Sequence, residues 1–482
     1  MEKMTSQQLA EKLKKAIECF PTFNPAQHKK FIVALLVLKR ISDKFAEELD
    51  EYGEDDPNLF NTYVPEEARW TSLQRAAENL GQKLNDAVRL LEVEERNSHL
   101  RGLLSWVDFN NQMELPETVL LQLFQHFSGI QLRNDGLENG AVTVGEAFIE
   151  FISYVAEERE KQDASKRLTP PDLNRLMAEL VEARPNECVY DPAAGTASTL
   201  IAVSQKVNGK ITLYGQELDL DNYRLAKINL FLHEMDALLE QGDVLRAPAF
   251  VEDGRAKQFE RIVCHPEFSR RNWGEEVATN DPFRRFAYGV PPNSNADWAF
   301  IQHIIASLSE RGRAVVLMPH GVLFRSGAEG EIRKKIVEAD LLEAVIGLPK
   351  KIFFGVGIPG VILVFSKPKP DERRGKVLFV DASKKYEAGT SKNRLRDEDI
   401  AKIVETYRQF MEVDGYSKVV TLDEIASHDY NLNIARYLPT ASDEEAIDWT
   451  ELQGELESVK DERSSLEEAL QRVFEVLGGE IR

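Results

Sequence analysis

Two short apolar runs, each followed by an acidic residue, constrain the fold of this chain more than any other feature. The first run, Val189–Asp191, leads into the small-residue loop Pro192–Ser198 and then into an apolar helical segment. The second run, Ile211–Tyr214, ends near Glu217, which lies 22 residues after Gly195. In a doubly wound α/β sheet, this order places a cofactor at the carboxyl ends of neighbouring strands.

The composition of the first loop indicates the class of cofactor. The loop contains neither the GxGxxG pattern of dinucleotide sites nor the GK[ST] pattern of a P-loop, so no phosphate contact is implied. Small residues let a ligand approach the backbone, and an acid after the second strand can hold ribose hydroxyls. We therefore predict a nucleoside cofactor such as S-adenosylmethionine. The predicted binding residues are Asp191, Ala193, Gly195, Thr196 and Glu217.

Asp191 has two interpretations at this point. It organises the loop or meets the methionine ammonium group, or it is simply a helix cap. Glu217 is either the ribose ligand or a surface acid.

A third segment lies where such a fold requires one. Phe259–Cys264 has the pattern of a buried strand, and His265-Pro266-Glu267-Phe268 follows it. The chain here resembles the modification (M) subunit of type I restriction–modification systems, a family of DNA adenine-N6 methyltransferases. The resemblance covers nearly the whole chain, and its most specific stretches are Tyr214–Glu217, Tyr288–Phe300, Met318–Arg325, Leu341–Pro349, Gly357–Pro359 and Asp429–Asn433.

The resemblance implies a fold and further site residues. The expected fold is an α/β, doubly wound methyltransferase sheet dependent on S-adenosylmethionine, with an α-helical amino-terminal domain and a carboxyl-terminal helical tail. Thr169 and Pro170 match the end of the family's Phe-Tyr-Thr-Pro motif at the cofactor site. Asp243 matches the family residue near the cofactor's adenine amine, although a Gly-Asp pair alone is more often a turn.

Three motifs depart from the family pattern. His265-Pro266-Glu267-Phe268 replaces Asn-Pro-Pro-Phe, Gly195-Thr196-Ala197 replaces Gly-Ser-Gly, and Arg167-Leu168-Thr169-Pro170 replaces Phe-Tyr-Thr-Pro. In the family, the Asn oxygen and the following Pro carbonyl accept the hydrogens of the target amine, and the aromatic ring stacks on the flipped base. His265 accepts only through an unprotonated ring nitrogen, and Glu267 adds a negative charge. We expect methyl transfer to be weakened or lost.

Three functions remain open. The first is an active adenine-N6 methyltransferase that serves as an M subunit. The second is a catalytically inactive subunit with the same fold, which assembles and clamps DNA in a phage-defence complex. The third and least favoured is a methyltransferase for another acceptor, such as RNA or a protein amide. The catalytic positions in question are His265, Pro266, Glu267 and Phe268.

The charge balance bears on the partners. The formal net charge is −21, which opposes DNA binding by the isolated chain, because neutralising phosphates drives such binding. Local basic pairs after the catalytic loop are candidate DNA contacts. The resemblance implies two copies of this chain on one specificity subunit, together with a restriction subunit and double-stranded DNA. The predicted DNA-binding residues are Arg270, Arg271, Arg284 and Arg285.

The remaining features concern location and domain limits. The chain shows no run of 18 apolar residues and no signal-peptide core, and its three cysteines are too widely spaced for a metal cluster. These observations predict a cytoplasmic protein with no membrane contact and no metal site. The predicted domains are a helical domain over 1–155, an α/β domain over 165–440 and an assembly helix over 441–482.

Three segments carry weaker signals. A heptad-like seam runs from Leu452 to Leu477, interrupted by Arg463, and pairs either with a partner or with its own domain. The long irregular stretch 272–295 is typical of a functional or disordered loop. Asp297 and Trp298 are candidates for either the target pocket or the core, and His320 is more consistent with a structural role.

Overall fold

The computed structural model describes residues 3–53, 60–75, 78–160, 168–353, 359–389 and 392–438. The amino-terminal part is helical, as predicted. Its first helix begins at a capping box, in which Thr5 and Gln8 satisfy each other's backbone N–H groups. The helices are α1 (Ser6–Ala16), α2 (Pro25–Tyr52), α3 (Trp70–Gln74), α4 (Leu80–Val93), α5 (Glu117–Ser128) and α6 (Ala141–Glu160).

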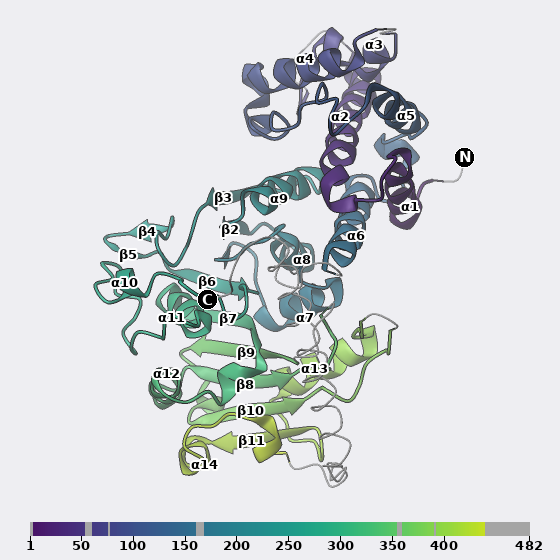
Figure 1. The fold of residues 1–482 in the computed structure, drawn as a ribbon. Coiled ribbons are helices and arrows are strands. Elements are labelled where there is room, and N and C mark those ends of the chain that lie inside the picture. Colours follow the sequence, from purple (N-terminus) through teal and green to yellow (C-terminus); the bar gives the residue numbers. More distant parts are fainter. Residues whose placement is uncertain are drawn as a thin grey trace, which may run out of the picture. The chain divides into compact units, whose positions relative to one another are not determined.

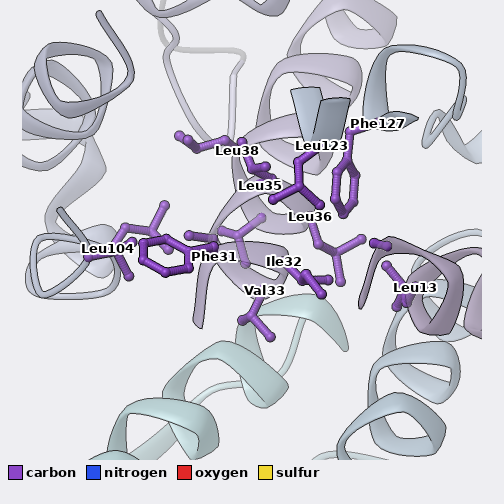
Figure 2. Close-up of a cluster of buried hydrophobic side chains, with 14 of the residues drawn as sticks. Leu13, Phe31, Ile32, Val33, Leu35, Leu36, Leu38, Leu104, Leu123 and Phe127 are labelled. Carbon is purple, nitrogen blue, oxygen red and sulfur yellow. The ribbon is translucent and has the colours of Figure 1, made fainter. Parts of the chain in front are cut away.

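Helix α2 forms the centre of this helical region. Asn24 caps its first turn and Pro25 follows at the first helical position, where the missing N–H costs nothing. All residues from Phe31 to Leu38 are buried, so α2 is apolar on all sides and other helices surround it. Figure 2 shows this core, in which side chains of α2 lie among Leu13, Leu104, Leu123 and Phe127.

The rest of the described chain is built on a nine-stranded sheet (Figure 1). The strand order is β11-β10-β8-β9-β7-β6-β1-β2-β3, and β9 and β11 run antiparallel to their neighbours. A separate hairpin joins β4 (Val251–Glu252) and β5 (Arg255–Ala256). The nine strands are β1 (Cys188–Asp191), β2 (Thr212–Glu217), β3 (Ala237–Gln241), β6 (Phe259–Cys264), β7 (Leu308–Pro319), β8 (Leu342–Gly347), β9 (Gly360–Lys367), β10 (Lys376–Asp381) and β11 (Ser417–Thr421).

Helices cover both faces of the sheet. Val189 of β1 belongs to the core formed with α7, α8 and α13, whereas the next residue, Tyr190, contacts His303 of α11. Because successive strand residues point to opposite faces, α11 covers the other side. The helices of this part are α7 (Pro171–Val181), α8 (Ser198–Lys206), α9 (Leu220–Leu232), α10 (Glu275–Ala278), α11 (Asp297–Ala306), α12 (Ala328–Glu338), α13 (Asp397–Gln409) and α14 (Leu422–Ser427).

The strand order determines where a ligand can bind. From β1 the chain adds β2 and β3 on one side and then returns to place β6 on the other side of β1. Such a reversal opens a crevice at the carboxyl ends of the central strands, which is where doubly wound folds bind their ligands. The predicted fold class, a doubly wound α/β sheet preceded by a helical region, is confirmed.

The predicted domain limits remain predictions. Leu225, Ile228 and Leu232 of α9 share one apolar core with the amino-terminal helices, and Arg40 of α2 pairs with Glu234. Residues 161–167, at the predicted boundary, and the seam Leu452–Leu477 with Arg463 lie outside the described residues. None of the helices in the described ranges is long and apolar enough to cross a bilayer.

Candidate cofactor and catalytic site

A cavity of about 810 Å³ lies at the carboxyl ends of β1, β2, β3 and β6. Loops that follow these strands form most of its wall, and Lys29 of α2 and Ile152, Val155 and Ala156 of α6 also line it. Of the predicted cofactor residues, Thr169, Pro170 and Asp191 are not part of the wall. Those that line the cavity are Ala193, Gly195, Thr196, Glu217 and Asp243.

The loop after β1 has the tight geometry that its composition indicates. Gly195 has φ +55° and no heavy atom within 4 Å of the position that a Cβ would occupy, so its surface is open to a ligand. Ala197 also lies in the left-handed region, at φ 60°, where glycine is favoured. The alanine therefore adopts a strained backbone at a position where the family pattern has glycine.

Two carboxyl groups hold this loop through backbone N–H groups. Asp191 Oδ1 accepts from the N–H of Ala193 at 3.0 Å, and Glu217 Oε2 accepts from that of Gly195 at 2.7 Å. Glu217 Oε1 also accepts from the N–H of Asp219 at 2.8 Å. Since α8 starts after Ala197 and has no side-chain cap, Asp191 is not a helix cap. It organises the loop.

Burial changes the protonation of both acids. The pKa of Asp191 is raised from 3.8 to about 8, chiefly by desolvation and also by the nearby Glu217 carboxylate, against the opposing effect of the Ala193 N–H. Desolvation also raises the pKa of Glu217, although the N–H groups of Asp219 and Gly195 oppose this effect. A positively charged ligand in the cavity would favour the ionised form of both groups.

The loop after β3 contributes a carboxylate that is already paired. Asp243 forms a two-pronged ion pair with Arg270, and its Oδ1 accepts from the N–H of Leu245 at 3.1 Å. Asp243 and Arg270 both line the cavity. Arg270 was predicted to contact DNA, but in this structure it lines the cavity and pairs with Asp243.

The loop after β6 brings two of the altered motifs together. Thr169 Oγ1 lies 2.7 Å from His265 Nδ1, so Thr169 supports the catalytic loop. The His265 ring is 5.1 Å from that of Phe268 and stacks on Phe353 at 5.4 Å, measured between ring centroids. His265, Pro266, Glu267 and Phe268 all line the cavity. Pro170, the next residue after Thr169, is buried and immediately precedes α7.

The four predicted DNA-contacting arginines have different environments. Arg271 and Arg284 are exposed. The side chain of Arg285 is fully buried, pairs with Asp281, and donates to the carbonyls of Val244 and Leu245 at 2.8 Å each. The prediction that Arg285 contacts DNA is therefore wrong, because its charge is enclosed and satisfied within the protein.

Arg285 instead helps to order the long loop 272–295. Trp273 is fully buried and packs with Val244, Leu245 and Phe300 in a small apolar cluster. This cluster and the Arg285 contacts tie the loop to the wall of the cavity. In the structure the loop is therefore folded onto the wall of the cavity.

The sequence pattern predicted several residues of this region only weakly or not at all. Asp297 is fully buried and accepts from the N–H of Ser269, while Trp298 is 2% exposed and belongs to the interior. His320 is half-buried, and burial lowers its pKa. Lys29 and Phe353 carried no local signal, because only the fold brings Lys29 of α2 to the cavity and Phe353, after β8, to the ring of His265.

The topology and the cavity define a class of protein, the methyltransferases with a doubly wound sheet. Comparison with known proteins identifies the family. The "N-6 DNA Methylase" family matches residues 140–446, and "HsdM N-terminal domain" matches residues 9–127. The chain belongs to the N-6 DNA methylase family and is a methylase (M) subunit of the type I restriction–modification kind, whose reaction is adenine-N6 methylation.

Individual relatives and structures agree with this assignment. Two methylase subunits of Methanocaldococcus jannaschii type I restriction enzymes, MjaVII and MjaVIII, are each 32% identical to this chain. The alignments cover 89% and 94% of this chain and 74% and 82% of the relatives. A type I methyltransferase subunit from Streptococcus thermophilus has the same fold, with a TM-score of 0.79 at 24% identity over 90% of this chain and 99% of that one.

Proposed function

We propose that this M subunit binds S-adenosylmethionine in the 810 Å³ cavity and transfers its methyl group to adenine weakly or not at all. The observation that carries the proposal is the environment of His265. An imidazole stands where the family has an amide oxygen acceptor, and one of its two ring nitrogens is engaged by Thr169.

The residues present fit this cofactor. Gly195 gives it an open backbone surface, and Glu217 lies beside that surface at the end of β2, where an acid can hold ribose hydroxyls. By the family resemblance, Asp243, which lines the same cavity, is the acceptor for the adenine amine. When bound, S-adenosylmethionine supplies an electrophilic methyl group and two positive charges, which buried carboxyl groups at Asp191 and Glu217 complement.

The catalytic loop is the weak part of the site. The attacking amine needs acceptors for its two hydrogens as charge develops on nitrogen. With Nδ1 bound to Thr169, His265 can accept only through Nε2, and only in the tautomer in which Nδ1 donates to Thr169. Glu267 places an exposed carboxylate where the family has a second proline. Losing one such contact typically costs 10²- to 10³-fold in kcat.

Restoring the family motif tests this proposal. The double variant His265→Asn with Glu267→Pro should raise methyl transfer to DNA in the assembled complex by about 100-fold, measured with tritiated S-adenosylmethionine. Each single variant is the matched control and should give a smaller gain. If the unmodified chain already methylates adenine as fast as the restored variant does, the proposed weakening is wrong.

A calorimetric experiment separates cofactor binding from transfer. Glu217→Ala should weaken S-adenosylmethionine binding, since it removes both the ribose ligand and the acceptor that holds Gly195. An unchanged affinity would remove Glu217 from the site. An unmodified chain that binds no cofactor would favour the second candidate, an inactive subunit that assembles and clamps DNA.

We also propose the partners that the family implies. With a net charge of −21, the isolated chain lacks the cationic field that drives counterion release from DNA. Tight engagement of double-stranded DNA therefore requires a complex, with two copies of this chain on a specificity subunit and with a restriction subunit. Within this complex, the exposed Arg271 and Arg284 are the DNA contacts retained from the sequence prediction.

A further inference from the structure

The chain takes an unusual turn immediately after the catalytic loop. Ser269 follows Phe268 and precedes Arg270, and its φ is +53°. Residues other than glycine rarely adopt this conformation, because it costs about 1–2 kcal/mol. Ser269 is exposed, so packing around its own side chain does not hold it there. A neighbouring segment must supply the stabilisation.

That segment is the start of α11. The backbone N–H of Ser269 donates to Asp297 Oδ1 at 2.8 Å, and the Asp297 side chain is fully buried. The backbone N–H of Ala296, the residue before Asp297, donates to the carbonyl of Arg270 at 3.0 Å. Ser269 and Arg270 are therefore hydrogen-bonded to the consecutive residues Asp297 and Ala296 at the amino-terminal end of α11.

Asp297 is itself held in place by two neighbours. Its second carboxylate oxygen, Oδ2, pairs with Arg325, which also bonds Glu329 at 2.9 Å. Its backbone N–H donates to Asn295 Oδ1 at 2.8 Å. The acceptor for Ser269 is thus a carboxyl oxygen whose orientation is fixed by two partners at the first residue of a helix.

The turn controls two side chains of the cavity wall. Phe268, on one side of Ser269, packs edge-on against Phe353 at 5.6 Å between ring centroids. Arg270, on the other side, pairs with Asp243. Asp297 does not line the cavity itself, and its hydrogen bond to Ser269 connects it to the cavity wall.

We propose that Asp297 is a positioning residue for the methyltransferase site, which holds the left-handed turn at Ser269 and so keeps Phe268 and Arg270 in the cofactor cavity. The inference rests on the proposed cofactor site. Asp297 and Arg325 come from the segments Tyr288–Phe300 and Met318–Arg325. The inference assigns both segments to the support of the catalytic loop.

The experiment uses the full-length chain with two measurements, hydrogen exchange by mass spectrometry over residues 265–272 and calorimetric binding of S-adenosylmethionine. Asp297→Ala should speed exchange at Ser269 and weaken cofactor binding, each by at least about tenfold. Adding Ser269→Gly should restore most of the cofactor affinity, because glycine adopts a positive φ without support.

Two further variants separate positioning from general stability. Arg325→Met should lower the melting temperature, since it leaves a buried carboxyl without its cation, and should weaken cofactor binding less than Asp297→Ala does, because the acceptor for Ser269 remains. Asp297→Asn retains an oxygen at this place and should exchange like the unmodified chain. It also serves as the test variant if Asp297→Ala does not fold.

The outcomes are decisive in either direction. Unchanged exchange in Asp297→Ala, faster exchange in Asp297→Asn, or failure of Ser269→Gly to restore the alanine variant would each overturn the positioning role. If the unmodified chain binds no S-adenosylmethionine, the proposed cofactor site fails, and the exchange of residues 265–272 alone then decides whether Asp297 holds the turn.

Discussion

The side-chain hydroxyl of Thr169 lies 2.7 Å from Nδ1 of His265, across 96 residues of sequence. Both residues belong to motifs that depart from the family pattern, one before α7 and the other after β6. Their contact means that the two departures form one local environment. A substitution at either position should therefore be interpreted together with the other.

A double-mutant cycle tests this contact. Thr169→Val removes the hydroxyl at nearly constant shape and should lower the free energy of unfolding by about 1 kcal/mol, because it leaves a half-buried ring nitrogen without this partner. In a His265→Ala background, the same change should cost little, giving a coupling energy of about 1 kcal/mol. Thr169→Ser, which keeps the hydroxyl, is the control. Equal costs in both backgrounds would show that the contact contributes nothing.

The strained loop residue Ala197 should tolerate glycine. Ala197→Gly relieves a left-handed alanine and should leave the free energy of unfolding unchanged or raise it by up to about 1 kcal/mol. Ala194→Gly, in the same loop but with an ordinary φ, should lower it by about 0.5–1 kcal/mol. Urea unfolding of both variants measures the difference. A similar loss in both would mean that Ala197 is unstrained.

The buried Asp191 should make stability depend on pH. Because its pKa is raised from 3.8 to about 8, the folded chain keeps a proton that the unfolded chain releases between these values. The stability from neutral Asp191 is therefore present below pH 4 and is lost as pH rises toward 8. Asp191→Asn cannot ionise, so its advantage over the unmodified chain in urea unfolding should grow from pH 5 to pH 8. Parallel stability curves would contradict the raised pKa.

Substitutions at the adjacent residues Arg284 and Arg285 should have different effects on stability and on DNA binding. Arg285→Met leaves the buried Asp281 and two carbonyls without their donor and should destabilise the chain by about 3–5 kcal/mol. Arg284→Met, at an exposed position, should change stability by less than about 0.5 kcal/mol. In the assembled complex, Arg284→Met should instead weaken the salt dependence of DNA binding. The slope of the logarithm of the binding constant against the logarithm of the salt concentration should change by about one unit. An Arg284 variant with unaltered DNA binding would remove this residue from the interface.

The carboxyl-terminal segment should be required for assembly. Deleting the residues after Ser442 removes the seam Leu452–Leu477 and should leave a folded α/β part, because the described sheet and its helices end before Leu438. Co-purification with a specificity subunit should then be lost. Assembly by the truncated chain would show that the seam packs within its own protein. Nanomolar DNA binding by the unassembled full-length chain would separately contradict the need for a complex.

Local patterns were sufficient for much of the fold. The apolar runs at Val189–Asp191 and Phe259–Cys264 are strands in the structure, and the run Ile211–Tyr214 overlaps β2. Asp191 and Glu217 meet at the same loop, as expected for strands whose carboxyl ends share one edge. These features depend on a few consecutive residues and on the right-handed connection of parallel strands.

The basic pairs show where sequence reasoning failed. Arg270-Arg271 and Arg284-Arg285 look alike in sequence, yet each pair has one exposed member and one member that is bound inside the protein. No local pattern separates them, because Arg270 pairs with a distant acid, and Arg285, beside its local acid Asp281, also donates to distant backbone carbonyls. Asp243 reaches Arg270 across 27 residues, and backbone carbonyls reach Arg285 across 40 and 41.

The sequence by itself determined the class of sheet, the place of the cofactor loop, the family and the substitution of His265 and Glu267 in the catalytic motif, since all of these are written in short contiguous segments. Only the tertiary structure decided that Thr169 supports His265, that Asp297 holds Ser269 and that Arg285 is buried. The physical reason is that the energy of a charged or polar group depends on which distant partner folding brings to it and on how much water remains around the pair.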